Sequence, residues 1–356
     1  MQDRHSRLLG DQHVILYPSF VYHDEVTETW KMPINGFVYQ NGREGIRQRM
    51  FLGFMQQLLK IDREIIDSSE IFHQRIQGFL HQPQRRVSVV FRIGENEQAV
   101  TGVSKRTGHV QVEATLRPEE LPNEARGLAA TAALATGPIQ HQVNCRVHLA
   151  PEDQRQIENA VHIIPPRGIS VISDIDDTLK ISQVAHSRQL LHNTFLNPFA
   201  TVPGMAPLFR SWAEQGAAFH YVSSSPWQLF EPLDTLLRES GFPIGSYHLR
   251  SYRFGDPSVF KIFLSRKRNK YNIIKSMFRM FPQRRFILVG DSGEKDAEIY
   301  GKIARKFPDQ IERILIRRVE GKPWTRQRVA KAFRKIPNEL WQSFKVPTQI
   351  RYVEFS

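Results

Sequence analysis

The sequence predicts an α/β protein in which a parallel sheet follows a smaller, β-rich α+β domain. In the second half, short apolar stretches alternate with helical stretches, which is typical of a parallel sheet covered on both faces. In the first half, the period of the apolar residues changes to two after Pro83, which indicates half-buried strands. Because Pro165 and Pro166 separate the two patterns, we expect domains at residues 1–165 and 166–356.

The expected first domain begins with helices and continues with strands. Apolar residues recur at helical spacing in two segments, and alternation or a short apolar run marks five others. The expected helices are 43–60 and 68–80, and the expected strands are 36–39, 87–92, 99–103, 110–114 and 143–149. No catalytic constellation is visible in this domain, so its role stays open.

The expected second domain alternates strands and helices along its whole length. Its strands are expected at 168–173, 217–222, 247–250, 286–289 and 311–317, and its helices at 204–215, 226–240, 269–281 and 294–306. In parallel sheets of this kind, ligands bind beyond the carboxyl ends of the strands. The residues at those ends are therefore the candidates for function.

Composition limits the classes of protein that fit. The chain of 356 residues has one cysteine, Cys145, which excludes a disulfide framework and favours a reducing, cytoplasmic compartment. No run of 18 or more apolar residues occurs, so we expect no membrane span. The net charge of +13 is uneven, because residues 1–165 hold 18 basic and 19 acidic residues and residues 166–356 hold 31 and 17. Such a basic domain favours an anionic partner.

Acidic and hydroxyl residues follow the predicted strands of the second domain. The first strand ends in an Asp-x-Asp-x-Thr motif formed by Asp174, Asp176 and Thr178. Ser223 and Ser224 follow the next long strand, and Gly-Asp-x-x-x-x-Asp at 290–296 supplies Asp291 and Asp296. Lys270 opens the helix before that last strand, and Lys267 is its rival. Parallel strands would bring all of these to one edge.

The four motifs, in this order, resemble those of the haloacid dehalogenase superfamily of phosphohydrolases over roughly residues 166–320. The sequence segments around them, at 173–180, 202–205, 221–229 and 288–300, are similar to those of the actin-patch-associated phosphatidate phosphatase family. Ser224 departs from the Asn expected in the second motif. The resemblance implies a Rossmann-like sheet of the haloacid dehalogenase type and a magnesium-dependent enzyme that converts phosphatidate to diacylglycerol.

The resemblance also implies a role for each motif residue. Asp174 would be the nucleophile that forms an aspartyl-phosphate, and Asp176 the general acid and base. The phosphate would be bound by Thr178, Ser223, Ser224 and Lys270, with Ser225 as a rival of Ser223. Mg²⁺ would be held by Asp174, Asp176 and Asp291, with Asp296 at the same site. Asp177 is interpreted as a turn residue outside the catalytic set.

The expected access to the site favours a large or surface-bound substrate. The segments 179–202 and 252–268 are too short for a sizeable cap domain, so the site is expected to be open. This agrees with phosphatidate at an anionic membrane surface, where the enzyme would be peripheral, and nucleic acid is a less favoured partner. A phosphatase of the same mechanism acting on phosphoprotein or nucleotide is the alternative, as is an inactive membrane-binding protein. Residues 324–336 would form either an interfacial helix or a helix that covers the sheet.

Overall fold

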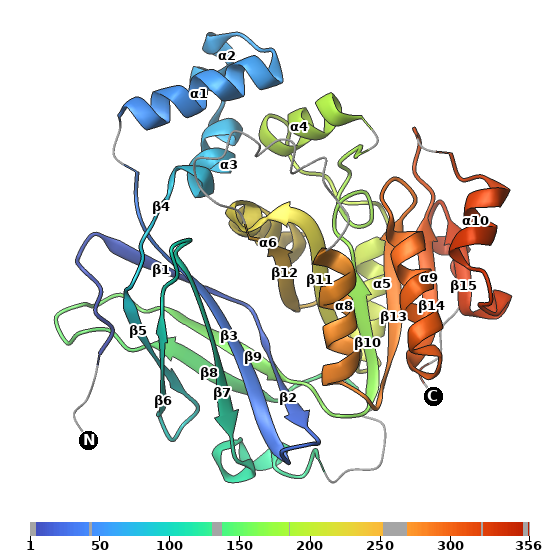
Figure 1. Cartoon of the computed structure of the whole chain (residues 1–356), viewed down its shortest axis with the longest axis horizontal. Coiled ribbons are helices and arrows are strands. Elements are labelled where there is room, and N and C mark those ends of the chain that lie inside the picture. Colours follow the sequence, from blue (N-terminus) through green and yellow to red (C-terminus); the bar gives the residue numbers. More distant parts are fainter. Residues whose placement is uncertain are drawn as a thin grey trace.

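The computed structural model describes residues 5–42, 45–129, 137–184, 186–251, 269–321, 323–351 and 355. Its strands form two separate sheets, a curled sheet from the first part of the chain and a parallel sheet from the second (Figure 1). The predicted mixed α/β class is confirmed. The expected segment 252–268, which includes Lys267, lies outside the described residues.

The N-terminal sheet has nine strands in the order β1-β3-β2-β9-β8-β5-β6, with β4 and β7 both paired to β3. Its strands are β1 (Gln12–Tyr17), β2 (Phe20–Asp24), β3 (Thr29–Gln40), β4 (Gln82–Pro83), β5 (Ser88–Ile93), β6 (Gln98–Val103), β7 (His109–Leu116), β8 (Gln142–Val147) and β9 (Glu158–Ile163). Every neighbouring pair is antiparallel except β2 and β9. The predicted strands are confirmed here, whereas β1, β2 and β9 were not predicted.

Three helices lie at the upper end of the N-terminal sheet in Figure 1: α1 (Ile46–Leu59), α2 (Arg63–Ser68) and α3 (Glu70–Leu80). Helix α3 begins where the Ser69 side chain accepts a hydrogen bond from the Phe72 N–H, an ordinary N-cap. Gly78 of α3 packs so closely against the main chain of Gln228 that a Cβ atom would collide with its carbonyl oxygen. The helices expected at 43–60 and 68–80 are thus confirmed, and α3 contacts the C-terminal part of the molecule.

The second sheet is parallel throughout, with six strands in the order β12-β11-β10-β13-β14-β15. These are β10 (Gly168–Ser173), β11 (Ala218–Pro226), β12 (Ser246–Arg250), β13 (Arg284–Asp291), β14 (Ile311–Arg317) and β15 (Trp341–Phe344). All six residues of β10 are buried, as expected for a central strand covered on both faces. The carboxyl ends of β10, β11 and β13 meet at one edge.

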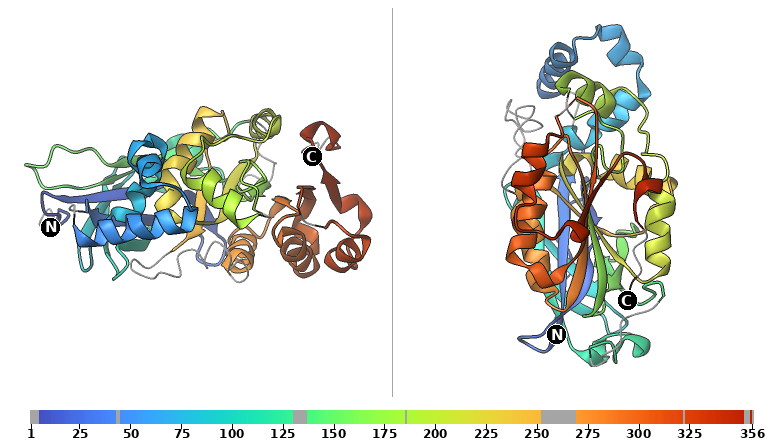
Figure 2. Two further views of the ribbon diagram at one scale, coloured as in Figure 1. Left: turned by 90° about the horizontal axis from the view of Figure 1, so that it is seen from above. Right: turned by 90° about the vertical axis from the view of Figure 1, so that its right-hand side faces the viewer.

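Helices cover both faces of the parallel sheet (Figure 2). On one face, α5 (Met205–Glu214) and α6 (Phe230–Glu239) share a core with Val171 and Val289. On the other face, α8 (Asn269–Met280), α9 (Asp296–Lys306) and α10 (Arg326–Ala332) belong to the core around Ile172 and Leu288. Phe333, just after α10, is buried there, so this segment is a covering helix and shorter than predicted. Helix α4 (Ser187–Phe195) occupies the segment after the first motif.

The two sheets share contacts rather than meeting at a free linker. The Tyr17 ring of β1 stacks on Trp227, which follows β11, at 4.0 Å between centroids. At the junction, the buried Arg284 guanidinium donates from Nη1 to the carbonyls of Pro165 at 2.7 Å and Arg167 at 2.6 Å. Its Nε donates to Ser170 Oγ at 2.8 Å, and burial lowers the pKa of Arg284 to about 9. The domain boundary at residue 165 stays a prediction.

The helices of the described residues are too short or too polar to cross a bilayer.

Candidate active site

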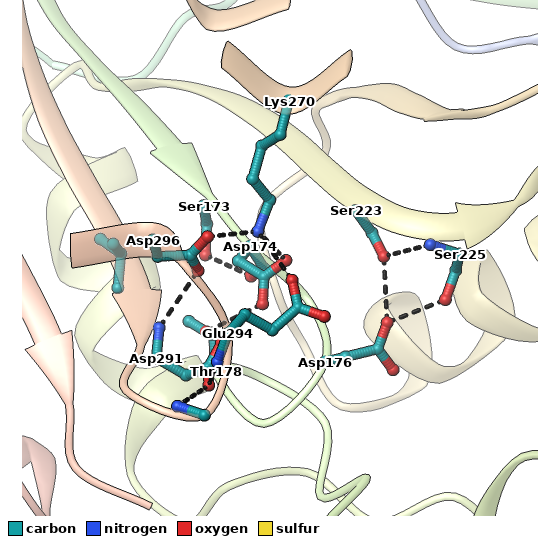
Figure 3. A network of polar contacts seen from close by, with 12 residues as sticks. Ser173, Asp174, Asp176, Thr178, Ser223, Ser225, Lys270, Asp291, Glu294 and Asp296 are labelled. Atoms are coloured by element: carbon teal, nitrogen blue, oxygen red, sulfur yellow. Dashed lines mark hydrogen bonds and ion pairs between the residues drawn. The ribbon is translucent and has the colours of Figure 1, made fainter. Parts of the chain in front are cut away.

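The Asp174 carboxylate lies directly after the end of β10, where a tight loop begins. Its N–H continues the strand pairing by donating to Val289 O at 2.9 Å, which fixes the main chain. The side chain is 1% exposed and accepts from Lys270 Nζ at 2.7 Å and from Thr178 Oγ1 at 3.2 Å. Figure 3 shows both donors pointing at it. Burial is the main reason that the pKa of Asp174 lies well above its ordinary value.

Lys270 comes from the first turn of α8 and extends its ammonium group into a set of carboxylates (Figure 3). Besides Asp174, it lies 2.6 Å from Asp296 Oδ1 and 3.5 Å from Glu294 Oε2. Burial alone would lower the pKa of Lys270, but the surrounding carboxylates outweigh it and raise that pKa well above its usual value. The lysine is therefore a fixed positive charge at the strand edge.

Asp291 ends β13 and brings a third carboxylate to the same place. Its Oδ1 accepts from the Glu294 N–H at 2.9 Å, but its Oδ2 is buried and has no hydrogen-bond partner among the described residues. Burial, and then the charges of Asp296 and Asp174, raise the pKa of Asp291 well above its ordinary value. The preceding residue must be Gly290, because a Cβ there would collide with the Asp296 carboxylate.

These carboxylates can hold a hard cation. One oxygen each from Asp174, Asp291 and Asp296 lies within 4.8 Å of the others, and all three side chains are buried. Carboxylate oxygens are the donors that Mg²⁺ prefers, and a buried oxygen without a partner is expected where a ligand is to bind. The donor set and the orphaned Asp291 oxygen therefore fit a divalent metal such as Mg²⁺.

Asp176 points away from this cluster into a separate hydrogen-bond network (Figure 3). Its Oδ2 accepts from Ser223 Oγ at 3.0 Å and from Ser225 Oγ at 2.8 Å, both at the end of β11. Its Oδ1 lies 2.8 Å from both Lys180 Nζ and Ser182 Oγ. Burial would raise the pKa of Asp176, but Lys180 and the hydroxyl donors hold it well below the ordinary value. Two carboxylates two positions apart thus occupy different environments.

Asp177, between these two networks, shapes the loop. It has a φ of +57°, and its carboxylate accepts the N–H groups of Ser182, Gln183 and Val184 at 2.6–2.7 Å. Arg317 Nη1 donates to the Asp177 carbonyl at 2.6 Å. These bonds fix the loop whose ends carry Asp176 and Lys180.

The structure brings the predicted site residues to one edge, in two groups. Asp174, Thr178, Lys270, Asp291 and Asp296 surround the carboxylate cluster. Ser223 instead contacts Asp176, as its rival Ser225 also does. Ser224 is half-buried between these two buried serines.

Three polar residues of the site were not predicted: Lys180, Ser182 and Glu294. All three are buried. Glu294 lies inside the second acidic motif, which could have signalled it, whereas Lys180 and Ser182 lie just beyond the first motif. Lys180 and Ser182 come four and six residues after Asp176, in a loop rather than a helix. No periodic pattern predicts which way such side chains point.

Comparison with known proteins finds relatives of the region that contains this site. Residues 169–318 match the family described as phosphatidate phosphatase APP1, catalytic domain. The chain is 30% identical over 265 residues to phosphatidate phosphatase APP1 of Saccharomyces cerevisiae, covering 71% of this chain and 41% of that protein. It is 35% identical over 163 residues to the uncharacterized protein C29B5.04c of Schizosaccharomyces pombe, covering 45% and 26%.

The chain thus spans less than half of the length of these two relatives. A crystal structure of the Amycolatopsis cytochrome P450 reductase GcoB aligns with 90% of this chain and 73% of its own at 9% identity and a TM-score of 0.21, which is too low to bear on the fold. The matched region contains every acidic residue of the site described above. Residues 169–318 of the chain are thus similar to the catalytic domain of the APP1 phosphatidate phosphatase family.

Proposed function

We propose that the chain is a phosphatidate phosphatase that hydrolyses phosphatidate to diacylglycerol and phosphate. The observation that carries the proposal is the constellation at the strand edge: Asp174 beside Lys270 and two further carboxylates, with Asp176 held apart by hydroxyl groups. The family match over residues 169–318 supports the substrate. The order of motifs along β10, β11, α8 and β13 supports a haloacid dehalogenase type of fold for the domain at 166–356.

In the proposed reaction, an Asp174 oxygen attacks phosphorus, and the bond from phosphorus to the glycerol oxygen breaks. Asp176 gives a proton to that leaving oxygen. Water then attacks the aspartyl-phosphate, Asp176 accepts the proton of the water, and Asp174 and phosphate are released. Because its pKa is low, Asp176 is ionised and can accept a proton in the second step. The negative charge of a bound phosphate would raise that pKa, so that Asp176 carries a proton for the first step.

The remaining motif residues are proposed to bind the phosphoryl group. Lys270 and Thr178 already donate to Asp174, so their hydrogen-bonding groups lie beside the atom that would bond to phosphorus. Ser223 and Ser224, at the end of β11, would donate to phosphate oxygens from the other side. Fixed donors of this kind stabilise charge as it develops in the transition state.

The proposed cofactor is Mg²⁺. Asp174, Asp291 and Asp296 would hold it through their carboxylates and Asp176 through its main-chain carbonyl. The three described residues of the cluster all offer oxygen, which supports a hard cation. When bound, Mg²⁺ would offset the repulsion between the Asp174 carboxylate and an anionic phosphate.

The proposed substrate is a lipid because the described residues of 179–202 form α4 and its flanking loops, which are smaller than a cap domain. An edge without a large cap suits a substrate that stays in a membrane surface, so the enzyme is proposed to act as a peripheral protein. The domain at 1–165 would then support the catalytic domain through α3 and β1, which both contact the segment after β11.

The test is phosphate release from phosphatidate in detergent micelles, with and without Mg²⁺. Asp174→Asn should reduce the rate at least about a thousandfold, because the amide cannot form the acyl-phosphate. The control is Asp309→Asn, a change of an exposed acid after α9, which should leave the rate unchanged. Release from an aryl phosphate that needs Asp174, without release from phosphatidate, would contradict the lipid substrate and leave the chemistry in place.

A further inference from the structure

The helices on one face of the parallel sheet are unusually basic. Helices α8, α9 and α10 together carry nine Lys or Arg residues and two acidic residues. Of the two acids, Asp296 is buried in the site and Glu298 accepts from Arg328 Nε at 2.9 Å. On the opposite face, α5 and α6 carry two basic and four acidic residues. These three helices, with a net charge of +7, therefore carry half of the net charge of +14 of residues 166–356.

Four of these cations form a cluster, which we call the α8–α9 cation cluster: Lys275 and Arg279 on α8, and Lys302 and Lys306 on α9. The last three are exposed. Lys275 and Arg279 are four positions apart on α8, Lys302 and Lys306 are four apart on α9, and the two helices are in contact. The positive charges of Arg279, Lys306 and Lys302 also lower the pKa of Lys275. None of the four pairs with a carboxylate within the described residues.

Like charges that lie together without carboxylates do not stabilise a fold. The cluster therefore indicates a partner that supplies the negative charge. The cluster lies on the two helices that begin at the candidate active site, α8 with Lys270 and α9 with Asp296. Lys275 and Lys302 follow these residues by about 8–9 Å along a helix axis, and Arg279 and Lys306 by about 14–15 Å.

The shape and composition of this face favour an extended anionic surface. Helix α9 packs between α8 and α10, which gives a broad layer of helices. Single-stranded nucleic acid needs exposed aromatic rings on which bases stack. Here the rings of Phe278 and Tyr300 are buried, and that of Tyr271 is half-buried beneath the Lys302 ammonium, 4.2 Å from its centroid.

We propose that the α8–α9 cation cluster docks the protein on an anionic phospholipid leaflet, with the outer face of α8 and α9 toward the lipid headgroups. This inference rests on the proposed function, because a lipid substrate favours a membrane leaflet over other polyanions as the partner of the cluster. Each cation near an anionic leaflet is worth about fivefold in affinity. The cluster would therefore govern binding to membranes without contributing to the bond-breaking step.

The experiment is co-sedimentation of the full chain with vesicles of phosphatidylcholine alone or with about a quarter phosphatidylserine, which carries negative charge but is no phosphomonoester. The test variant is Lys275→Gln with Arg279→Gln, Lys302→Gln and Lys306→Gln, since Gln keeps helix propensity. The control removes four exposed cations from the N-terminal domain, as Arg85→Gln with Arg86→Gln, Lys105→Gln and Arg106→Gln.

We expect binding only to the anionic vesicles, weakened by about six hundredfold in the test variant and less than about fivefold in the control. Binding should also fall between about 0.05 and 0.5 M salt. An equal loss in both variants, or no binding to anionic vesicles, would overturn the proposal. So would high affinity for duplex DNA that the test variant loses while vesicle binding stays unchanged.

Phosphate release from a short-chain phosphatidate dispersed as monomers separates this inference from the proposed function. The test variant should retain the parent rate on that substrate, which also shows that it is folded. If the parent has no activity there but binds anionic vesicles through the cluster, the proposed function fails and the docking surface stands. If both proteins are active and bind equally, the docking proposal fails alone.

Discussion

The N-terminal sheet and the parallel sheet both have well-buried cores, but they bury different kinds of side chain. The strands of the N-terminal sheet alternate buried and exposed residues, as in β8, where Val143, Cys145 and Val147 face inward. Among the described residues, the six buried carboxylates all lie in the second part of the chain. All six belong to the two motifs, at 174–178 and 290–296, at the edge of the parallel sheet that carries the candidate site.

This difference separates residues that support folding from residues that support chemistry. Removing a carboxylate from water costs free energy unless it is paired and hydrogen-bonded, so such groups are rarely kept for stability. The N-terminal sheet contains no buried carboxylate among its described residues. A buried cation of the first part of the chain, Arg75 of helix α3, has its Cζ 3.1 Å from the centroid of the Phe199 ring. Substitutions in the two regions should therefore affect stability and activity in different ways.

The largest effect is expected from Lys270→Met. The change removes the ammonium group that contacts Asp174, Asp296 and Glu294, and leaves buried carboxylates without their counter-ion. We expect a loss of about 3–5 kcal/mol in the free energy of unfolding together with loss of phosphatase activity. Urea denaturation measures the first quantity. Lys275→Met in the same helix is the control and should change stability by less than about 0.5 kcal/mol. An equally stable Lys270→Met protein would contradict the ion-pair description.

An intermediate effect is expected from Gly78→Ala, which tests the contact between the two regions. The added methyl group would collide with the carbonyl of Gln228, so α3 must move away from the segment after β11. We expect a loss of about 1–3 kcal/mol in stability. The matched control is Gly53→Ala in α1, where a Cβ has no neighbour within 4 Å, and there Ala should stabilise by up to about 1 kcal/mol. Equal effects of the two substitutions would show that the regions do not depend on this contact.

The smallest effect, and one of opposite sign, is expected from Asp291→Asn. Because burial and neighbouring carboxylates raise the pKa of Asp291 well above its ordinary value of 3.8, the folded state binds more protons than the unfolded state above that pH. Stability without metal should therefore fall as pH rises through and above about 4, and the fall should be smaller in the Asn variant. At neutral pH with a chelator, we expect Asn to stabilise by about 1–2 kcal/mol.

Thermal unfolding at several pH values measures the difference in stability between Asp291→Asn and the parent. Addition of Mg²⁺ supplies the comparison, because it should raise the melting temperature of the parent and leave that of Asp291→Asn almost unchanged. A variant that is less stable than the parent in chelator at neutral pH would contradict the account of Asp291 as an uncompensated charge.

The sequence predicts the fold and the site to different depths. The parallel sheet follows from apolar strands such as β10 and β13, and its direction alone brings Asp174 and Asp291 together. The pairing of Asp176 with Lys180 and Ser182 could not be predicted, because a loop has no periodicity and its geometry depends on the Asp177 bonds. Strand β1 was not predicted, because it is stabilised by pairing with the distant strand β3, which a local sequence pattern does not show.

Arg284 has a consequence for the order in which the molecule assembles. It hydrogen-bonds to Ser170 and to the carbonyls of Pro165 and Arg167. These residues precede Arg284 by more than a hundred positions, so they are synthesised well before it. Strand β10 also needs β13, which begins with Arg284, as a partner on one side. Contacts between such distant positions form late, because closing a long loop has an entropic cost. A nascent chain that has not reached residue 284 therefore leaves this junction open, and the N-terminal sheet is free to fold first.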